Sequence, residues 1–136
     1  MTVIVCLSDD GGMTFNKRRQ SRDAAVTADI AKLVGDGVLF ISDFSLNLFS
    51  DSSLSVIASS DPLSVAADDD FAFLEDRGAS QYAEKIKKLV IYKWNRKYPT
   101  DFKFDIEPAL FGFHIAETVE FSGKSHEKIT REIWVL

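Results

Sequence analysis

The segment QYAEKIKKLVIYKW, residues 81–94, carries the clearest structural signal in the chain. Apolar side chains recur in it at helical spacing after Gly78 and predict a helix; they are Tyr82, Ile86, Leu89 and Val90. The run VIYKW, residues 90–94, predicts a buried strand that follows this helix directly. A helix that leads into a strand is typical of a domain in which helices pack on a sheet.

The residues after this segment predict a β-hairpin near the end of the chain. Five apolar residues of one parity should line one face of its first strand; they are Phe111, Phe113, Ile115, Val119 and Phe121. Residues 122–127 are polar or glycine and form the predicted turn. By the same alternation, Ile129, Ile133 and Val135 share one face of the last strand.

The first half of the chain predicts four more strands and one amphipathic helix. The strands are mostly apolar runs and cover residues 2–7 (TVIVCL), 38–41, 54–58 and 71–74. Ser21 is the expected N-cap of the helix, and Asp23 lies in its first turn. The apolar stripe of this helix comprises Val26, Ile30, Leu33 and Val34. Residues 8–20 are expected to form a polar, glycine-bearing loop. Together these elements predict one α/β domain over residues 1–136 with a mixed sheet.

Composition limits the class of protein. The chain has 136 residues, of which 46% are hydrophobic and 12% aromatic, and this is enough to bury a core. Its net charge of −5 argues against general nucleic-acid binding, because neutralising phosphates needs a basic surface. The single cysteine, Cys6, has no partner for an internal disulfide, which fits a reducing compartment. No apolar run approaches the ~20 residues of a membrane span, so we expect a soluble, cytoplasmic protein.

Several segments resemble the dihydrofolate reductases. QYAEKIKKLVIYKW is similar to that family's helix with an early Tyr, which leads through a Lys-Leu pair into a strand. KYPTDFKFDIEP, residues 97–108, is similar to its acidic-aromatic segment before the final hairpin. Gly12-Met13 resembles the start of its mobile substrate loop. The resemblance implies an α/β, dihydrofolate reductase-like mixed sheet with helices on both faces and a C-terminal antiparallel hairpin.

The resemblance also implies an activity, the NADPH-dependent reduction of a pterin or related heterocycle. Asp23 falls where the family carries its active-site carboxylate, and there it would orient and help protonate the substrate. The resemblance further assigns Cys6, Met13, Thr27 and Tyr92 to the substrate and Gly12, Ser59 and Ser60 to the cofactor. On the residues alone, Asp23 is equally well explained as an acid at the positive end of a helix.

Three departures from the family count against NADPH. The turn after the second strand reads Ser42-Asp43-Phe44-Ser45 and lacks the family's basic residue for the cofactor phosphates. Glu75-Asp76 stands in place of a Gly-Gly pair, and two unit charges of one sign ~4 Å apart repel by on the order of 4 kcal/mol near a protein surface. A strand and a helix on the adenine side are missing between Pro62 and Asp70.

Arg18 and Arg19 are candidates for binding an anion, because they precede a helix N-terminus. A phosphate or carboxylate of a ligand would suit them. The alternative is a solvated pair, or ion pairs with local acids such as Asp9, Asp10 and Asp23.

No other catalytic or metal-binding motif stands out. His114 and His126 lie far apart, with no Cys or His at metal-ligand spacing, so no metal site is predicted. A Ser–His–Asp triad could be assembled from the many serines, but no GxSxG motif singles out one of them.

Three functions therefore stay open. The first is the NADPH-dependent reductase. The second is a non-catalytic ligand-binding or regulatory protein that keeps the fold but has lost nicotinamide cofactor binding. The third is an interaction domain that forms a homodimer through its hairpin. A small-molecule ligand is the expected partner in the first two, and neither a nucleic acid nor a membrane is expected.

Overall fold

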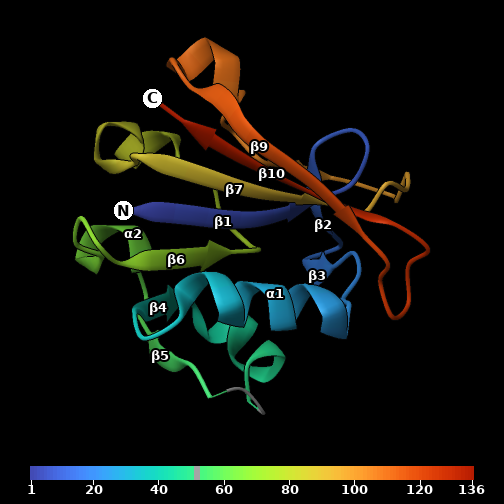
Figure 1. Cartoon of the computed structure of the whole chain (residues 1–136), viewed down its shortest axis with the longest axis horizontal. Coiled ribbons are helices and arrows are strands. Elements are labelled where there is room, and N and C mark those ends of the chain that lie inside the picture. The colour runs from blue at the N-terminus through green and yellow to red at the C-terminus, as the bar shows by residue number, and fades with distance from the viewer. Residues whose placement is uncertain (51–52) are drawn as a thin grey trace.

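A computed structural model of the chain describes residues 1–50 and 53–136. Its centre is a seven-stranded sheet in the order β5-β4-β6-β1-β7-β10-β9 (Figure 1). The five strands from β5 to β7 run parallel, whereas β10 is antiparallel to β7 and β9 is antiparallel to β10. The strands are β1 Thr2–Leu7, β4 Val38–Ile41, β5 Ser55–Ala58, β6 Phe71–Leu74, β7 Lys88–Lys93, β9 His114–Phe121 and β10 Ile129–Val135. The predicted mixed sheet with a closing antiparallel hairpin is confirmed.

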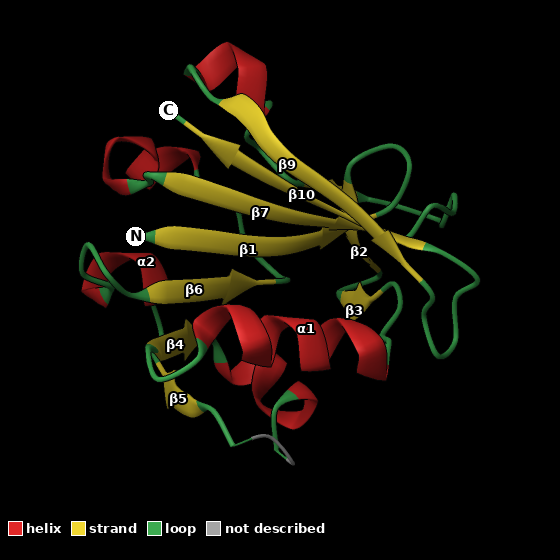
Figure 2. Ribbon diagram, in the orientation of Figure 1, coloured by secondary structure: helices red, strands yellow, loops and turns green. Residues whose placement is uncertain are grey.

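Both faces of the sheet are covered, which explains why β1 is apolar throughout. Val3 and Val5 point into one core cluster, Ile4 points into the other, and all three are fully buried. Helix α1, Ala24–Val34, covers the Ile4 face (Figure 2). The opposite face is covered by the short helix α2, Pro62–Val65, and the 3-10 helix η2, Ser80–Lys85. Two further 3-10 helices are η1, Asp43–Leu48, and η3, Pro108–Phe111.

The helix predicted from residue 81 is shorter than its apolar spacing indicated. It ends as η2 at Lys85, and β7 begins at Lys88. Leu89 and Val90 lie on opposite faces of this central strand and are 0% and 2% exposed. A strand buried on both faces is apolar at every position, so its residues also match the spacing of a helix.

The prediction that five residues of one parity line one face of a strand was also wrong. Phe111 belongs to η3, and a bulge in β9 shifts the register so that Ile133 pairs with Glu117 and Trp134 pairs with Ile115. One extra residue reverses the alternation from that point on. Ile115 is therefore 45% exposed and faces away from Phe121.

Residues 8–20, expected to be a loop, form two of the three strands of a second, small sheet. Its strands are β2 Gly12–Phe15, β3 Arg18–Arg19 and β8 Phe102–Lys103, in the order β3-β2-β8. Asn16 and Lys17 both have positive φ, 51° and 61°, as a two-residue type I′ hairpin turn requires. An Asn-Lys pair is a weaker turn signal than Asn-Gly, which is why the sequence did not reveal this hairpin.

Candidate functional site

Asp23 joins the N-terminus of α1 to the turn between β9 and β10. Asp23, rather than the predicted Ser21, is the N-cap, and its carboxylate accepts from Ala25 N at 2.8 Å. The same carboxylate accepts from the backbone N–H groups of Lys124 at 2.9 Å, Ser125 at 2.9 Å and His126 at 3.1 Å. Burial raises the pKa of Asp23, but these hydrogen bonds outweigh it and hold the pKa well below its ordinary value.

His126 extends this network to two more hydroxyl groups. Its Nδ1 lies 2.9 Å from Asp23 Oδ2, and its Nε2 lies 2.9 Å from Ser21 Oγ and 3.0 Å from the Tyr98 hydroxyl. The imidazole stacks on Trp94, with 4.6 Å between ring centroids and 21° between ring planes. The ring is therefore fixed in both position and orientation.

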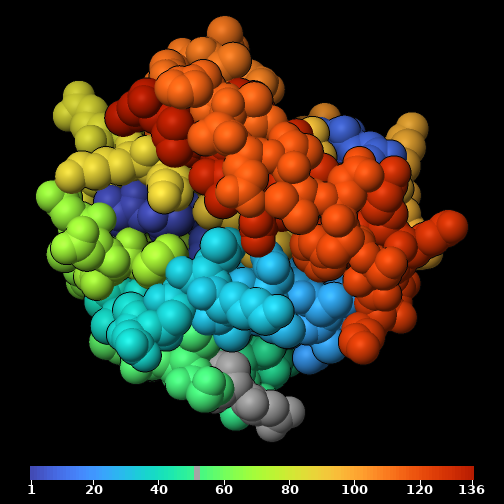
Figure 3. All heavy atoms as spheres, viewed as in Figure 1, coloured from blue at the N-terminus to red at the C-terminus, as the bar shows by residue number. Residues whose placement is uncertain are grey.

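The turn fits closely over Asp23. A Cβ atom at Gly123 would lie 2.6 Å from Asp23 Oδ2 and 2.6 Å from the carbonyl oxygen of His126, so only glycine fits there without a shift. In the space-filling view, atoms of the β9–β10 hairpin meet the N-terminal end of α1 (Figure 3). The hairpin thus closes the end of the molecule at which a substrate would approach Asp23.

Two spaces adjoin Asp23. One is a cavity of about 10 Å³, no more than the ~10–15 Å³ that a single water needs. The other is an open cleft of about 500 Å³, which Asp23 borders together with Arg22 and Thr27, although the Asp23 side chain is 0% exposed. Of the predicted substrate-binding residues, Cys6 and Thr27 line the small cavity together with Asp23. Burial raises the pKa of the Cys6 thiol, which makes it an inert apolar group.

The other two predicted substrate residues lie away from this cavity. Met13 is 4% exposed and belongs to the core cluster on the opposite face of the sheet, so Gly12-Met13 opens a packed strand rather than a substrate loop. Tyr92 is fully buried, and its hydroxyl donates to Asp29 at 2.6 Å. Arg131 binds the same Asp29 oxygen at 2.8 Å.

The two arginines of the predicted anion site differ in their surroundings. Arg19 forms a two-point ion pair with Glu75, at 2.6 and 2.7 Å, and its guanidinium also donates to the carbonyl of Phe44. The predicted alternative was an ion pair with a local acid such as Asp9, Asp10 or Asp23; Arg19 instead pairs with Glu75, 56 residues away in the sequence. The Arg18 side chain is exposed and forms no ion pair within residues 1–50 and 53–136.

The predicted cofactor residues are engaged within the chain. Ser59 Oγ accepts from Asp61 N at 3.1 Å, and the Ser60 carbonyl accepts from Arg77 at 2.6 Å. Gly12 lies in β2 of the small sheet, where a Cβ atom would collide with the Thr100 hydroxyl. Ser59 and Ser60 instead follow β5 at the edge of the large sheet.

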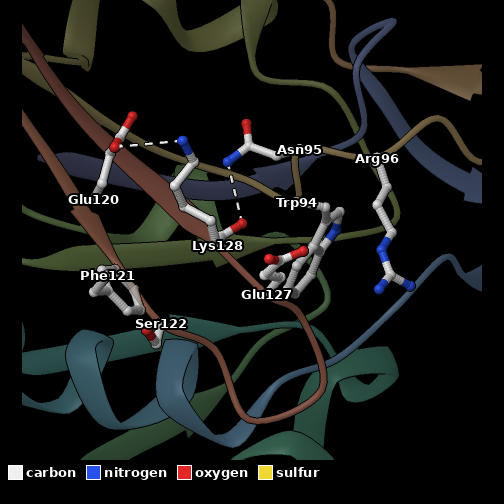
Figure 4. Close-up of a pocket in the computed structure, with 8 residues that line it drawn as sticks. All are labelled: Trp94, Asn95, Arg96, Glu120, Phe121, Ser122, Glu127 and Lys128. Carbon is white, nitrogen blue, oxygen red and sulfur yellow. Dashed lines mark hydrogen bonds and ion pairs between the residues drawn. The ribbon is translucent and has the colours of Figure 1, made fainter.

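Besides a cleft of about 500 Å³ that Asp23 borders, three further open clefts lie on the surface. One, of about 730 Å³, adjoins the β9–β10 turn (Figure 4), where Lys128 pairs with Glu120 at 3.5 Å and Asn95 donates to the Lys128 carbonyl. Another of about 730 Å³ lies beside Ser8–Gly11 and Trp134. The third, here termed the Arg18 groove, has a volume of about 570 Å³ and is lined by Phe15, Asn16, Arg18, Arg19, Gln20, Tyr98 and Pro99.

The sequence did not reveal that four residues of this site contact one another. They are His126, Trp94, Ser21 and Tyr98. They come from three separate segments, at residues 21, 94–98 and 126, so no local spacing connects the whole group. Among the described residues, no group of three His, Cys, Asp or Glu side chains could hold a metal ion. Within the same residues, no helix is long and apolar enough to cross a membrane.

In sequence, the chain matches no protein-family model and no curated protein. In structure, it is similar to the dihydrofolate reductase from Enterococcus faecalis complexed with NADP(H) and RAB-propyl. The two share 9% sequence identity with a TM-score of 0.67, over 99% of this chain and 95% of that chain. At such a low identity, the structural similarity is evidence for a shared fold alone. The chain therefore has the dihydrofolate reductase-like fold that its segments resembled.

Proposed function

We propose that this chain is a small-molecule-binding protein that keeps the dihydrofolate reductase-like fold but neither binds NADPH nor reduces a pterin. The observation that carries this proposal is the orientation of the Asp23 carboxylate. It points into the β9–β10 turn and is 0% exposed, even though the residue borders an open cleft of about 500 Å³.

Asp23 has no hydrogen-bonding capacity left for a substrate. Its Oδ1 accepts from Ala25 N and Lys124 N. Its Oδ2 accepts from the backbone N–H groups of Ser125 and His126, from the Ser125 hydroxyl and from the His126 ring. A carboxylate offers about four lone-pair sites. A pterin could reach Asp23 only if the whole turn moved away.

The residues around the expected phosphate positions do not fit a dinucleotide. Ser42 and Ser45, which flank the start of η1, donate their hydroxyl hydrogens to Asp76 and Glu75. Glu75 is 9% exposed and is ion-paired with Arg19, and Asp76 is ion-paired with Arg77, so both nearby cations are already neutralised. A diphosphate placed here would meet two carboxylates, and the resulting repulsion opposes binding.

The Arg18 groove supports binding of a different, anionic ligand. Its volume of about 570 Å³ lies within the ~300–1,000 Å³ typical of small-molecule sites. The unpaired guanidinium of Arg18 offers charge-assisted hydrogen bonds to a carboxylate or phosphate, and Phe15 and Tyr98 offer aromatic contact area. We therefore assign the ligand to this groove.

A titration with NADPH, followed by the fluorescence of Trp94 and Trp134, tests the loss of the cofactor. NADH and the nucleotide-free protein serve as controls. We expect no saturable change up to millimolar NADPH. Saturable binding in the micromolar range, which corresponds to ~8 kcal/mol, together with pterin-dependent oxidation of NADPH, would overturn the proposal.

A further inference from the structure

The hydrogen bonds around His126 have the order hydroxyl, imidazole, carboxylate. Ser21 Oγ lies 2.9 Å from Nε2, and Nδ1 lies 2.9 Å from Asp23 Oδ2. In acyl transfer, these three groups act as nucleophile, general base and orienting acid, whatever their order in the sequence. We propose that Ser21, His126 and Asp23 form a nucleophilic triad that hydrolyses small esters with an anionic acyl group.

The base and the acid of this triad are buried and fixed. The side chains of His126 and Asp23 are 2% and 0% exposed. Stacking on Trp94 sets the plane of the imidazole, and backbone N–H groups of the turn hold the carboxylate. With its proton on Nδ1 facing the carboxylate, His126 directs the lone pair of Nε2 at Ser21.

The nucleophile, in contrast, is only half-buried. Ser21 lines the small cavity beside Asp23, and its Oγ lies 3.4 Å from the hydroxyl of Tyr98, which lines the Arg18 groove. For the reaction, the carbonyl carbon of an ester in the groove must reach Ser21 past Tyr98. The Tyr98 hydroxyl is then the hydrogen-bond donor nearest to the developing oxyanion.

The proposed reaction has two balanced halves. First, Ser21 Oγ bonds to the acyl carbon while its proton moves to His126 Nε2, and the ester C–O bond breaks as Nε2–H protonates the leaving alcohol. Water then adds to the acyl-serine carbon and gives a proton to Nε2. The C–O bond to Ser21 breaks, Nε2 returns its proton to Oγ, and a carboxylic acid is released.

Arg18 sets the substrate class. Its guanidinium lines the groove without an ion pair of its own among the described residues, so it favours an acyl group that ends in a carboxylate. This assignment rests on the ligand groove proposed above. It does not depend on whether NADPH binds.

Labelling with a fluorophosphonate probe, followed by peptide mass spectrometry, tests the nucleophile. We expect the wild-type protein to be modified at Ser21 and Ser21→Ala to be unmodified. The matched control is Ser122→Ala, an exposed serine near the same turn, which should keep the label. Circular dichroism and thermal melts establish that both variants are folded.

Hydrolysis of p-nitrophenyl succinate and the neutral p-nitrophenyl acetate tests the substrate class. Ser21→Ala should lose ~10³-fold in kcat/KM on both esters, and Arg18→Ala should lose ~10-fold on the succinate alone. Absence of label at Ser21 in the folded wild-type protein, or equal hydrolysis by folded Ser21→Ala, would overturn the triad. A further outcome would separate the two proposals. If the triad were overturned in this way but succinate still protected the Arg18 side chain from chemical modification, the ligand groove would stand without the triad.

Discussion

Asp23 shows at the scale of one residue how a carboxylate can keep its place in a fold and lose its access. Its burial could be predicted, because it shares a helix face with Val26 and Ile30. Its partners could not, since Lys124 and His126 are 101 and 103 residues away in the sequence. The resemblance therefore singled out Asp23 without revealing which groups of the chain its carboxylate binds.

Replacing Asp23 by Asn tests how much the fold depends on this carboxylate. The amide nitrogen of Asn would face N–H donors of the turn, which leaves buried donors without acceptors. We expect a loss of about 3 kcal/mol in the free energy of unfolding, because each unsatisfied buried group costs ~1–3 kcal/mol. Urea unfolding measures it, with Asp36→Asn at an exposed position as the control. A loss under about 0.5 kcal/mol, the range of ordinary surface substitutions, would show that the turn holds without Asp23.

The pH dependence of stability follows from the same carboxylate. The pKa of Asp23 is lower in the folded protein than in the unfolded chain, so its contribution is fully present above the unfolded value of about 3.9. That contribution is lost as the pH falls below this value. We expect the urea midpoint of the wild-type protein to drop more steeply between about pH 5 and pH 2 than that of Asp23→Asn. If the urea midpoints of the wild-type protein and Asp23→Asn fell in parallel with pH, Asp23 would not be the source of this pH dependence.

At the scale of elements, an ion pair connects the hairpin β2–β3 to the end of β6. Arg19 in β3 binds Glu75, which follows β6 and also accepts from Ser45 of η1. The sequence predicted an ion-pair alternative for Arg19. It could not predict Glu75 as the partner, because the strand that carries Arg19 was expected to be loop.

A double-mutant cycle on Arg19 and Glu75 measures this link. Arg19→Ala leaves a nearly buried carboxylate unpaired, and breaking such a pair costs ~3–5 kcal/mol. We expect the second change, Glu75→Gln, to restore part of that loss, because it removes the uncompensated charge. Additive effects in urea unfolding would show that the two side chains are not coupled in solution.

Two of the failed predictions, the boundary between η2 and β7 and the face of β9, depend on how strands pair. The extent of η2 and β7 is decided by the neighbours β1 and β10, which bury Leu89 and Val90 from both sides. The bulge in β9 is defined only by its partner β10. Local periodicity contains neither kind of information.

At the scale of the whole molecule, the order of helices and strands was enough to predict the fold. The strand runs 2–7, 38–41 and 71–74 fall within residues that form β1, β4 and β6, and the closing hairpin lies where expected. The shape of the site was not predictable, because it depends on how the β9–β10 turn meets α1.

The most direct test of the enclosure of Asp23 by the β9–β10 turn is a calorimetric titration of dihydrofolate into the wild-type protein. The account predicts no binding heat, because the Asp23 side chain is 0% exposed and its carboxylate is saturated with hydrogen bonds. Binding of dihydrofolate with a micromolar Kd, abolished by Asp23→Asn, would contradict the account. The β9–β10 turn would then have to move to let a pterin reach Asp23.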